Sequence, residues 1–235
     1  MSCLQLSIGA LNDVVDADRD ARTKPAKPIP AGFVDRRVAG LVAGGLAVAG
    51  LGLAAAVRPE ALALAAVVLA IGYGYDLVLK PSPVSWLAFA VGIPILPLFA
   101  WLGVGAPLPP SFGLLLPAAA VAGSGLAIGN TLVDVERDLA AAVRTLPVAI
   151  GREPAWRVHV ALVVVLLAIA FGGGAWLRAA GPGLAVAFAG AVALAVGAVL
   201  VGHASAARRE RGWELECVGT ALLGLGWLVA IDAGP

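Results

Sequence analysis

The chain has 235 residues, of which 60% are hydrophobic and 13% are charged, and its formal net charge at pH 7 is +1. Soluble domains average about 45–50% apolar and about 25% charged residues, so this composition excludes an ordinary soluble domain and indicates a membrane protein. A net charge this close to zero gives no reason to expect a nucleic-acid partner. Cys3 and Cys217 are far apart and form no CxxC motif, so neither a zinc site nor a disulfide framework is expected.

The first apolar segment, residues 1–11, is too short to cross a bilayer, which takes about 20 mostly apolar residues. It lacks the positively charged start of a signal peptide, and we interpret it as the C-terminal half of a spanning helix whose beginning is missing. Seven longer apolar segments predict full transmembrane helices, at residues 38–57, 61–79, 85–104, 112–130, 156–177, 182–203 and 213–231. The predicted fold class is all-α, a polytopic membrane helical bundle formed by one domain over residues 1–235.

Lysine and arginine are unevenly distributed between the two sides of this topology. If the segment after residue 11 faces the cytoplasm and the loops alternate, every lysine and arginine except Arg58 and Arg178 falls on the cytoplasmic side. Basic residues concentrate in the cytoplasmic loops of membrane proteins, so the asymmetry supports this set of spans. We therefore expect an integral protein of the cell (inner) membrane.

Two segments on the cytoplasmic side repeat one arrangement of polar residues. The first contains Asn12, Asp16 and Asp20, and the second contains Asn130, Asp134 and Asp138. On a helix, residues four apart lie along one face. Like charges one turn apart repel, so such a face requires cations, and oxygen ligands are those that Mg²⁺ prefers. The repeat predicts a site for several divalent ions.

Basic residues follow each acidic motif. Lys24 and Lys27 follow the first motif, and Arg144 follows the second. This order is typical of sites for a metal-bound diphosphate, because Mg²⁺ joins carboxylates to phosphate oxygens while basic side chains bind the remaining oxygens. The alternative is that both segments are solvated interfacial loops, where ionisable residues cost little. The repeated repulsive spacing argues against this alternative, and motifs on one side of the membrane are expected to meet over one cavity.

The first motif resembles that of the UbiA-type intramembrane prenyltransferases. The family pattern NDxxDxxxD is present in full as Asn12, Asp13, Asp16 and Asp20. Residues 27–32 resemble the RPIPSG-like sequence that follows this pattern in the family.

The second family motif, DxxxD, is matched by Asp134 and Asp138, and TLPV follows at residues 145–148. Many relatives have a basic residue after the last aspartate, where this chain has Leu139, and Arg137 is expected to replace that phosphate contact. The YxxxK element of the family resembles Tyr75 and Lys80, with one extra residue between them.

The resemblance covers nearly the whole chain and implies the nine-helix fold of the family. The seven predicted spans then correspond to helices three to nine, and the residues before the first acidic motif correspond to part of helix two. The first helix and part of the second are expected to be absent, as in a gene fragment or after a misplaced start.

The resemblance implies transfer of a polyprenyl group from an allylic diphosphate donor to an aromatic or other lipophilic acceptor within the lipid bilayer. Mg²⁺ would hold the diphosphate and stabilise it as a leaving group, and an apolar groove would exclude water from the allylic cation. The family uses acceptors that range from hydroxybenzoates to chlorophyllides and glycerol-phosphate lipids. Quinone biosynthesis is an expected setting, while the acceptor and the prenyl chain length are not implied.

The resemblance also implies roles for individual residues. The expected metal ligands are Asn12, Asp13, Asp16, Asp20, Asn130, Asp134 and Asp138, of which Asp13 and Asn130 have supporting positions. The residues expected to bind the diphosphate are Lys24, Lys27, Lys80, Arg137 and Arg144. The expected catalytic residues are Tyr75, Asp76 and Lys80. Tyr75 would stabilise positive charge on the reacting carbon and Asp76 would orient the acceptor, the alternative for both being a place in the membrane interface.

Two other functions are compatible with the sequence. One is a cation-coupled transporter, although the acidic residues lie at span ends rather than at mid-membrane. The other is a non-catalytic, truncated homologue. His159 is expected at the interface without a catalytic role, Glu216 in a charged loop, and the spacing of Gly40 and Gly44 predicts close helix packing.

Overall fold

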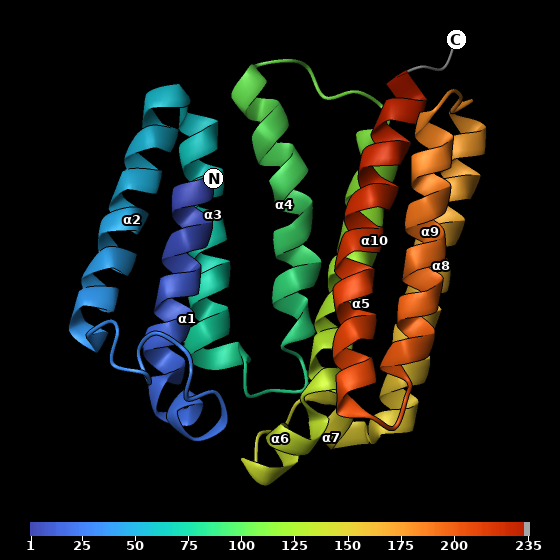
Figure 1. Ribbon diagram of the computed structural model, residues 1–235. Coiled ribbons are helices and arrows are strands. Elements are labelled where there is room, and N and C mark those ends of the chain that lie inside the picture. Colours follow the sequence, from blue (N-terminus) through green and yellow to red (C-terminus); the bar gives the residue numbers. More distant parts are fainter. Residues whose placement is uncertain (233–235) are drawn as a thin grey trace. The chain divides into compact units, whose positions relative to one another are not determined.

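The computed structural model describes residues 1–232, and every regular element in that range is helical (Figure 1). The elements in chain order are α1 (Ser2–Thr23), α2 (Arg36–Val57), α3 (Pro59–Gly74), the π-helix η1 (Tyr75–Leu79), α4 (Trp86–Val104), α5 (Phe112–Val133), α6 (Val135–Ala140), α7 (Leu146–Ile150), α8 (Arg152–Trp176), α9 (Gly183–Val201) and α10 (Ala206–Asp232).

The chain divides into two compact units. Unit 1 consists of Met1–Lys80 and Ile95–Leu108, and unit 2 consists of Pro81–Pro94 and the chain from Pro109 onward. Helix α4 crosses the boundary, since its first half belongs to unit 2 and its second half to unit 1.

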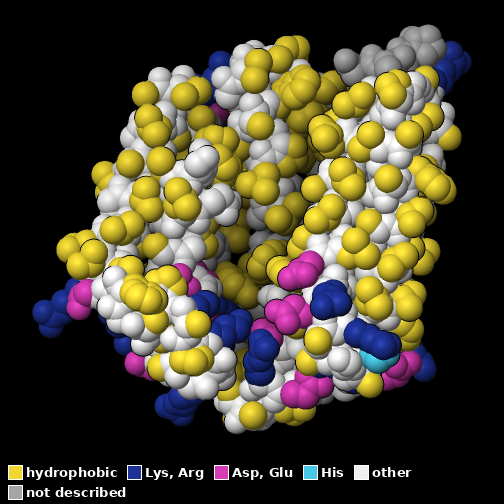
Figure 2. Space-filling view, viewed as in Figure 1, with side chains coloured by type: hydrophobic (Ala, Val, Ile, Leu, Met, Phe, Trp, Pro, Cys, Tyr) yellow, Lys and Arg dark blue, Asp and Glu magenta, His cyan; other side chains and the backbone are white. Residues whose placement is uncertain are grey.

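Seven helices of the described chain are long and apolar enough to cross a membrane, which confirms the predicted spans. Figure 2 shows hydrophobic side chains covering the length of the helices, whereas most of the visible charged side chains gather near helix ends. Local signals explain where two of the spans begin. Asp35 caps α2 by accepting hydrogen bonds from the backbone amides of Arg37 (2.8 Å) and Val38 (3.3 Å). Pro59 occupies the first turn of α3, where its missing N–H costs nothing.

Helix α1 extends further than the apolar segment at its start. It runs without interruption from Ser2 to Thr23, so the first acidic motif lies on a helix and not in a loop. The helix packs against α2 and α3, which lie beside it in Figure 1. Leu4 is fully buried in the core of unit 1, which also contains Ala54, Ala61, Ala65, Val68, Leu69 and Ile95. This packing anchors the acidic end of α1.

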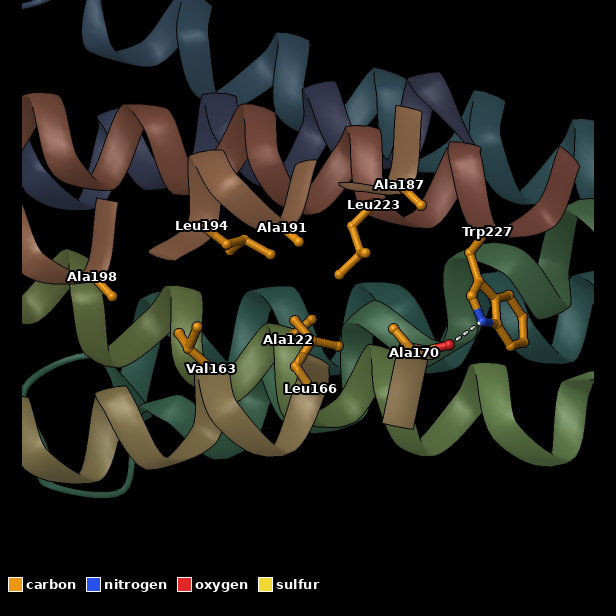
Figure 3. Close-up of a cluster of buried hydrophobic side chains, with 10 residues drawn as sticks. All are labelled: Ala122, Val163, Leu166, Ala170, Ala187, Ala191, Leu194, Ala198, Leu223 and Trp227. Atoms are coloured by element: carbon orange, nitrogen blue, oxygen red, sulfur yellow. Dashed lines mark hydrogen bonds between the residues drawn. The ribbon is translucent and has the colours of Figure 1, made fainter. Parts of the chain in front are cut away.

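The core of unit 2 is formed by α5, α8, α9 and α10. Figure 3 shows the side chains of α5 and α8 facing those of α9 and α10. Most of these residues are alanine or leucine, and the indole of Trp227 donates a hydrogen bond to the carbonyl oxygen of Ala170 (2.8 Å). This bond satisfies the indole N–H inside the core.

Glycines at intervals of seven residues bring α9 and α10 into close contact. They are Gly183, Gly190 and Gly197 on α9, and Gly212, Gly219 and Gly226 on α10. A Cβ atom added at Gly197 would lie 2.7 Å from the carbonyl oxygen of Gly212, and one at Gly226 would lie 2.7 Å from that of Gly183. Backbones can approach this closely only where side chains are absent.

The glycines that the sequence singled out do not make such contacts. A Cβ atom added at Gly40 or Gly44 would meet no described atom within 4 Å, so the prediction of close packing there is wrong. Small residues permit a close approach but do not require one, because a neighbouring helix must also present a smooth face.

Two sequence interpretations fail in unit 2. His159 is 1% exposed and Glu216 is 0% exposed, so His159 is not interfacial and Glu216 is not part of a charged loop. The reason is that α10 begins at Ala206, seven residues before the predicted span. Glu216 is therefore well inside the helix, on the side that packs against the rest of the unit.

Candidate diphosphate and metal site

The carboxylates of the first acidic motif lie on one buried face of α1. Asp16 is 7% exposed and Asp20 is 2% exposed, and Asn12 precedes them at the same interval of four residues. By contrast, the side chain of Asp18 on the same helix is 81% exposed. The predicted face is thus confirmed, and it points into unit 1 and not toward solvent.

Positive side chains, one from α1 itself and two from other segments, compensate this acidic face. Lys27 Nζ lies 2.7 Å from Asp20 Oδ2 and 2.8 Å from Asp13 Oδ1. Asp16 Oδ2 forms ion pairs with Lys80 and with Arg19 Nη2, the latter at 2.7 Å. The repulsion inferred from the sequence is therefore balanced by three cations, and two of them, Lys27 and Lys80, are residues predicted to bind phosphate.

The pKa of Lys27 reflects this environment. Burial acts to lower the pKa, but the hydrogen bonds and charges of Asp13 and Asp20 together raise it above the usual value of 10.5. Lys27 therefore remains protonated throughout the physiological range, as a phosphate-binding or carboxylate-bridging residue must.

A π-helical turn, η1, brings Tyr75 and Lys80 together. The backbone amide of Lys80 donates to the carbonyl oxygen of Tyr75 (2.8 Å), a bond that spans five residues instead of four. Lys80 Nζ lies 6.0 Å from the centre of the Tyr75 ring. The wider turn thus accommodates the extra residue between the two and keeps both on one side of the chain.

Asp76 is buried, 4% exposed, and contacts the first motif directly. Its Oδ1 accepts a hydrogen bond from the side-chain amide of Asn12 (2.7 Å). Its Oδ2 is buried and has no hydrogen-bond partner within the described part of the chain. Because a carboxylate can only accept from the NH₂ group, this bond fixes the amide of Asn12 with its oxygen turned away from Asp76.

The second acidic motif does not form a continuous helical face, contrary to the prediction. Helix α5 ends at Val133, and Asp134 (φ −95°, ψ 8°) separates it from the short helix α6. Asp134 pairs with Arg137 (2.5 Å), and Asp138 Oδ2 accepts from Thr145 Oγ1 (2.9 Å). Asn130 therefore lies in the last turn of α5, while Asp138 belongs to α6.

Two of the residues predicted to bind phosphate form no ion pair with the described part of the chain. Lys24 and Arg144 are exposed, and no ion pair within residues 1–232 holds either of them. Lys27, Lys80 and Arg137 are instead paired with carboxylates of the two motifs. Within the described residues, no group of three or more His, Cys, Asp or Glu side chains is gathered as a ready-made metal cage.

Sequence reasoning missed one basic residue beside the second motif. Arg209 of α10 is 0% exposed and forms an ion pair with Glu136, which lies between the two aspartates. Its guanidinium also donates to the carbonyl oxygens of His203 (3.2 Å) and Ala204 (2.8 Å). No local pattern indicated this contact, because the two partners are 73 residues apart.

Comparison with known families identifies one family over most of the chain. Residues 1–215 match the UbiA prenyltransferase family. The chain belongs to the UbiA prenyltransferase family. With its seven membrane-spanning helices, this UbiA-family chain is an integral membrane protein.

Among curated relatives, the chain is similar to digeranylgeranylglyceryl phosphate synthase of Methanopyrus kandleri, with 34% identity over 160 residues that cover 67% of this chain and 58% of the relative. It is also similar to the chloroplastic chlorophyll synthase of Arabidopsis thaliana, with 33% identity over 180 residues that cover 72% of this chain and 46% of the relative. The chain therefore spans about half the length of the curated relatives it matches.

Two solved structures have the same fold. A UbiA homologue from Aeropyrum pernix aligns with a TM-score of 0.77 at 19% identity, over 97% of this chain and 85% of that one. A UbiA homologue from Archaeoglobus fulgidus, bound to GPP and Mg²⁺, aligns with a TM-score of 0.66 at 19% identity, over 97% of this chain and 87% of that one.

Proposed function

We propose that this chain transfers a polyprenyl group from an allylic diphosphate to a lipophilic or aromatic acceptor in the membrane, acting as one transmembrane domain with both acidic motifs on the cytoplasmic side of the cell membrane. The observation that carries the proposal is the buried acidic face of α1, where Asp16 and Asp20 are paired with lysines that lie outside this helix. Burying carboxylates is costly, and a site for a metal and a diphosphate gives a reason to retain them.

The residues of unit 1 fit a hard divalent cation. Carboxylate and amide oxygens are its preferred ligands. The hydrogen bond to Asp76 turns the amide oxygen of Asn12 away from Asp76, on the helix face that also carries the buried Asp16 and Asp20. Asn12, Asp16 and Asp20 would hold Mg²⁺, with Asp13 in support. In unit 2, Asp134 and Asp138 would act as ligands, with Asn130 in support. When bound, Mg²⁺ would neutralise the diphosphate and improve it as a leaving group.

Lysines and arginines of the chain would bind the diphosphate. Lys24 and Arg144 form no ion pair within the described residues, and we therefore propose that they bind the phosphate oxygens directly. Lys27, Lys80 and Arg137 now compensate carboxylates, and a bound metal would free their ammonium and guanidinium groups to turn toward the diphosphate. The topology expected from the sequence puts both motifs on one side of the membrane.

In the reaction, the bond between the allylic carbon and the diphosphate oxygen breaks, and the electron pair leaves with the diphosphate. A nucleophilic atom of the acceptor then bonds to the allylic carbon and loses a proton. The ring of Tyr75 would stabilise positive charge on that carbon, held in place by the π-helical turn. We assign Asp76 a positioning role, because its hydrogen bond orients the amide oxygen of Asn12.

The names of the curated relatives support prenyl transfer and do not point to quinone biosynthesis, which is one of several roles within the family. Neither the transporter nor the non-catalytic alternative is favoured by a specific contact. Family membership argues against the transporter, and activity decides between an enzyme and a non-catalytic homologue.

The test uses the chain in lipid nanodiscs with GPP as donor and a panel of phenolic, quinone-precursor and glycerol-phosphate acceptors. Prenylated product is detected by mass spectrometry, and released diphosphate is counted in parallel. We expect product formation that EDTA abolishes and Mg²⁺ restores. Turnover that is indifferent to chelation would contradict the metal assignment, and no product with any acceptor would favour the non-catalytic alternative.

A further inference from the structure

A fully buried polar pair lies inside unit 2. Nε2 of His159 on α8 lies 2.7 Å from Oε1 of Glu216 on α10, and Nδ1 of His159 lies 3.0 Å from the carbonyl oxygen of Gly125 on α5. Both residues lie within predicted membrane spans. Ionisable side chains in a membrane interior are costly and usually have a functional role, and the proposed prenyl transfer does not use this pair.

The hydrogen bonds determine the state of the pair. A carbonyl oxygen only accepts, so Nδ1 of His159 must carry a hydrogen. One further proton is then shared between Nε2 and Glu216 Oε1, either on the imidazole with an ionised carboxylate or on the carboxyl group with a neutral imidazole. In both cases the pair has no net charge, and Oε2 of Glu216 is left as a hydrogen-bond acceptor.

Besides Nε of Arg209 near the start of α10, two buried polar atoms of this helix have no hydrogen-bond partner within the described residues. They are Oε2 of Glu216 and Oγ1 of Thr220. The two residues are four apart on a helix, so their side chains lie on one face, one turn from each other. Leaving such atoms unpaired in an apolar interior costs free energy. A hydroxyl group between them would satisfy both, because it donates to Glu216 and accepts from Thr220.

Thr220 also borders an apolar cavity of about 140 Å³, lined by Ala118, Ala122, Leu166, Leu223 and Trp227 among others. Three of its lining residues, Ala122, Leu166 and Thr220, also line a smaller pocket of about 10 Å³ that His159 and Glu216 border. Figure 3 shows Ala122, Leu166, Leu223 and Trp227 in this part of the core. An apolar cavity of about 150 Å³ is enough for a benzene ring.

We propose that unit 2 binds a neutral alcohol or phenol at this place. The hydroxyl group lies between Glu216 and Thr220, and an apolar body about the size of one six-membered ring fills the adjoining cavity. No lysine or arginine lines either space, and the His159–Glu216 pair is neutral, so carboxylates and phosphates are excluded. The inference rests on contacts within unit 2 alone and does not depend on the proposed function.

The experiment compares 4-fluorophenol with fluorobenzene by ¹⁹F NMR, using the chain in phosphatidylcholine nanodiscs and empty nanodiscs as the reference for partitioning into lipid. We expect saturable binding of 4-fluorophenol with one site per chain. Fluorobenzene should bind about tenfold more weakly, since it lacks both hydrogen bonds.

Two variants locate the site. Thr220→Val removes one hydrogen bond while keeping the shape of the side chain, and it should reduce the preference for 4-fluorophenol by about threefold or more. Ala122→Leu should fill the cavity and abolish binding of both probes. If Ala122→Leu fails to fold, Thr220→Val alone carries the test.

Three results would overturn the proposal. The first is a ¹⁹F signal of 4-fluorophenol that saturates no more than it does with empty nanodiscs. This result would mean that the small pocket beside His159 and Glu216 holds only a water molecule. The second is equal affinity for the two probes. The third is a preference for 4-fluorophenol that Thr220→Val does not change.

Discussion

The two acidic motifs have the same spacing of an amide and two aspartates, yet they fold differently. The first lies on the uninterrupted helix α1, is buried, and is compensated by Lys27 and Lys80 from outside that helix. The second is divided between α5 and α6, is more exposed, and contacts Arg137 and Thr145. A repeated sequence motif therefore does not specify a repeated geometry.

The difference has a physical consequence. In unit 1, the lysines hold the carboxylates in place before any ligand binds, so structure and function depend on the same contacts. In unit 2, the aspartates are held by short-range contacts, which are weak when exposed. We expect loss of either motif to abolish activity, but only the first motif to contribute strongly to stability.

The largest expected effect is on turnover, where the two motifs should behave alike. Asp16→Asn and Asp134→Asn should each lower turnover at least about 100-fold, because each removes a charge that we propose holds the metal and the diphosphate. The control variants are Asp18→Asn in unit 1 and Glu153→Gln in unit 2, whose carboxylates are exposed and should be dispensable. Turnover close to wild type in Asp134→Asn would mean that the second motif has no catalytic part.

A smaller effect should separate the motifs by stability. Lys27→Met leaves the buried Asp20 without its partner and should lower the free energy of unfolding by about 2 kcal/mol, a partly exposed case of breaking a buried pair. Arg137→Met breaks an exposed pair and should cost at most about 1 kcal/mol. Unfolding in mixed micelles by SDS titration measures both values. Equal losses would remove the distinction between a buried motif and an exposed one.

The third prediction concerns the orientation of Asn12. In Asp76→Asn, the new amide can donate to or accept from the Asn12 amide, so the orientation of the Asn12 oxygen is no longer fixed. The Mg²⁺ concentration that gives half-maximal binding should therefore rise about tenfold. Isothermal titration with Mg²⁺ and a non-hydrolysable GPP analogue measures this without turnover. In an Asn12→Ala background the same change should have little further effect. Additive losses in the double variant would show that Asp76 acts independently of Asn12.

The smallest effect is a pH dependence specific to unit 1. The pKa of Lys27 is higher in the folded chain than its usual value of 10.5, so its stabilising contribution is present below that value and is lost as the pH rises through the folded pKa. As the pH rises through the alkaline range, the midpoint temperature of thermal unfolding should therefore fall more steeply for the wild-type chain than for Lys27→Met. Parallel curves would indicate that the lysine is not held by Asp13 and Asp20.

Much of the architecture could be predicted from the sequence because it depends on local composition. The seven spans follow from long apolar segments, and the buried face of α1 follows from a spacing of four residues on a helix. Such patterns can be interpreted from one segment alone, because they require only that the segment is helical and that one of its faces is buried.

The features that could not be predicted depend on contacts between distant segments or on small changes of backbone. The break at Asp134 and the π-helical turn after Gly74 alter a helix by a few dihedral angles, which residue types do not specify. The burial of Glu216 depends on where α10 begins and on its pairing with His159, 57 residues away. The extra residue between Tyr75 and Lys80 was the one visible signal of the π-helical turn.

The central claim is that the buried face of α1 binds a divalent metal that holds a prenyl diphosphate. Electron paramagnetic resonance of Mn²⁺, used in place of Mg²⁺ and titrated into the chain with GPP in nanodiscs, tests this most directly. We predict tightly bound Mn²⁺ in the wild-type chain and in Asp18→Asn, and its loss in Asp16→Asn. Binding of Mn²⁺ in Asp16→Asn with wild-type affinity would contradict the account.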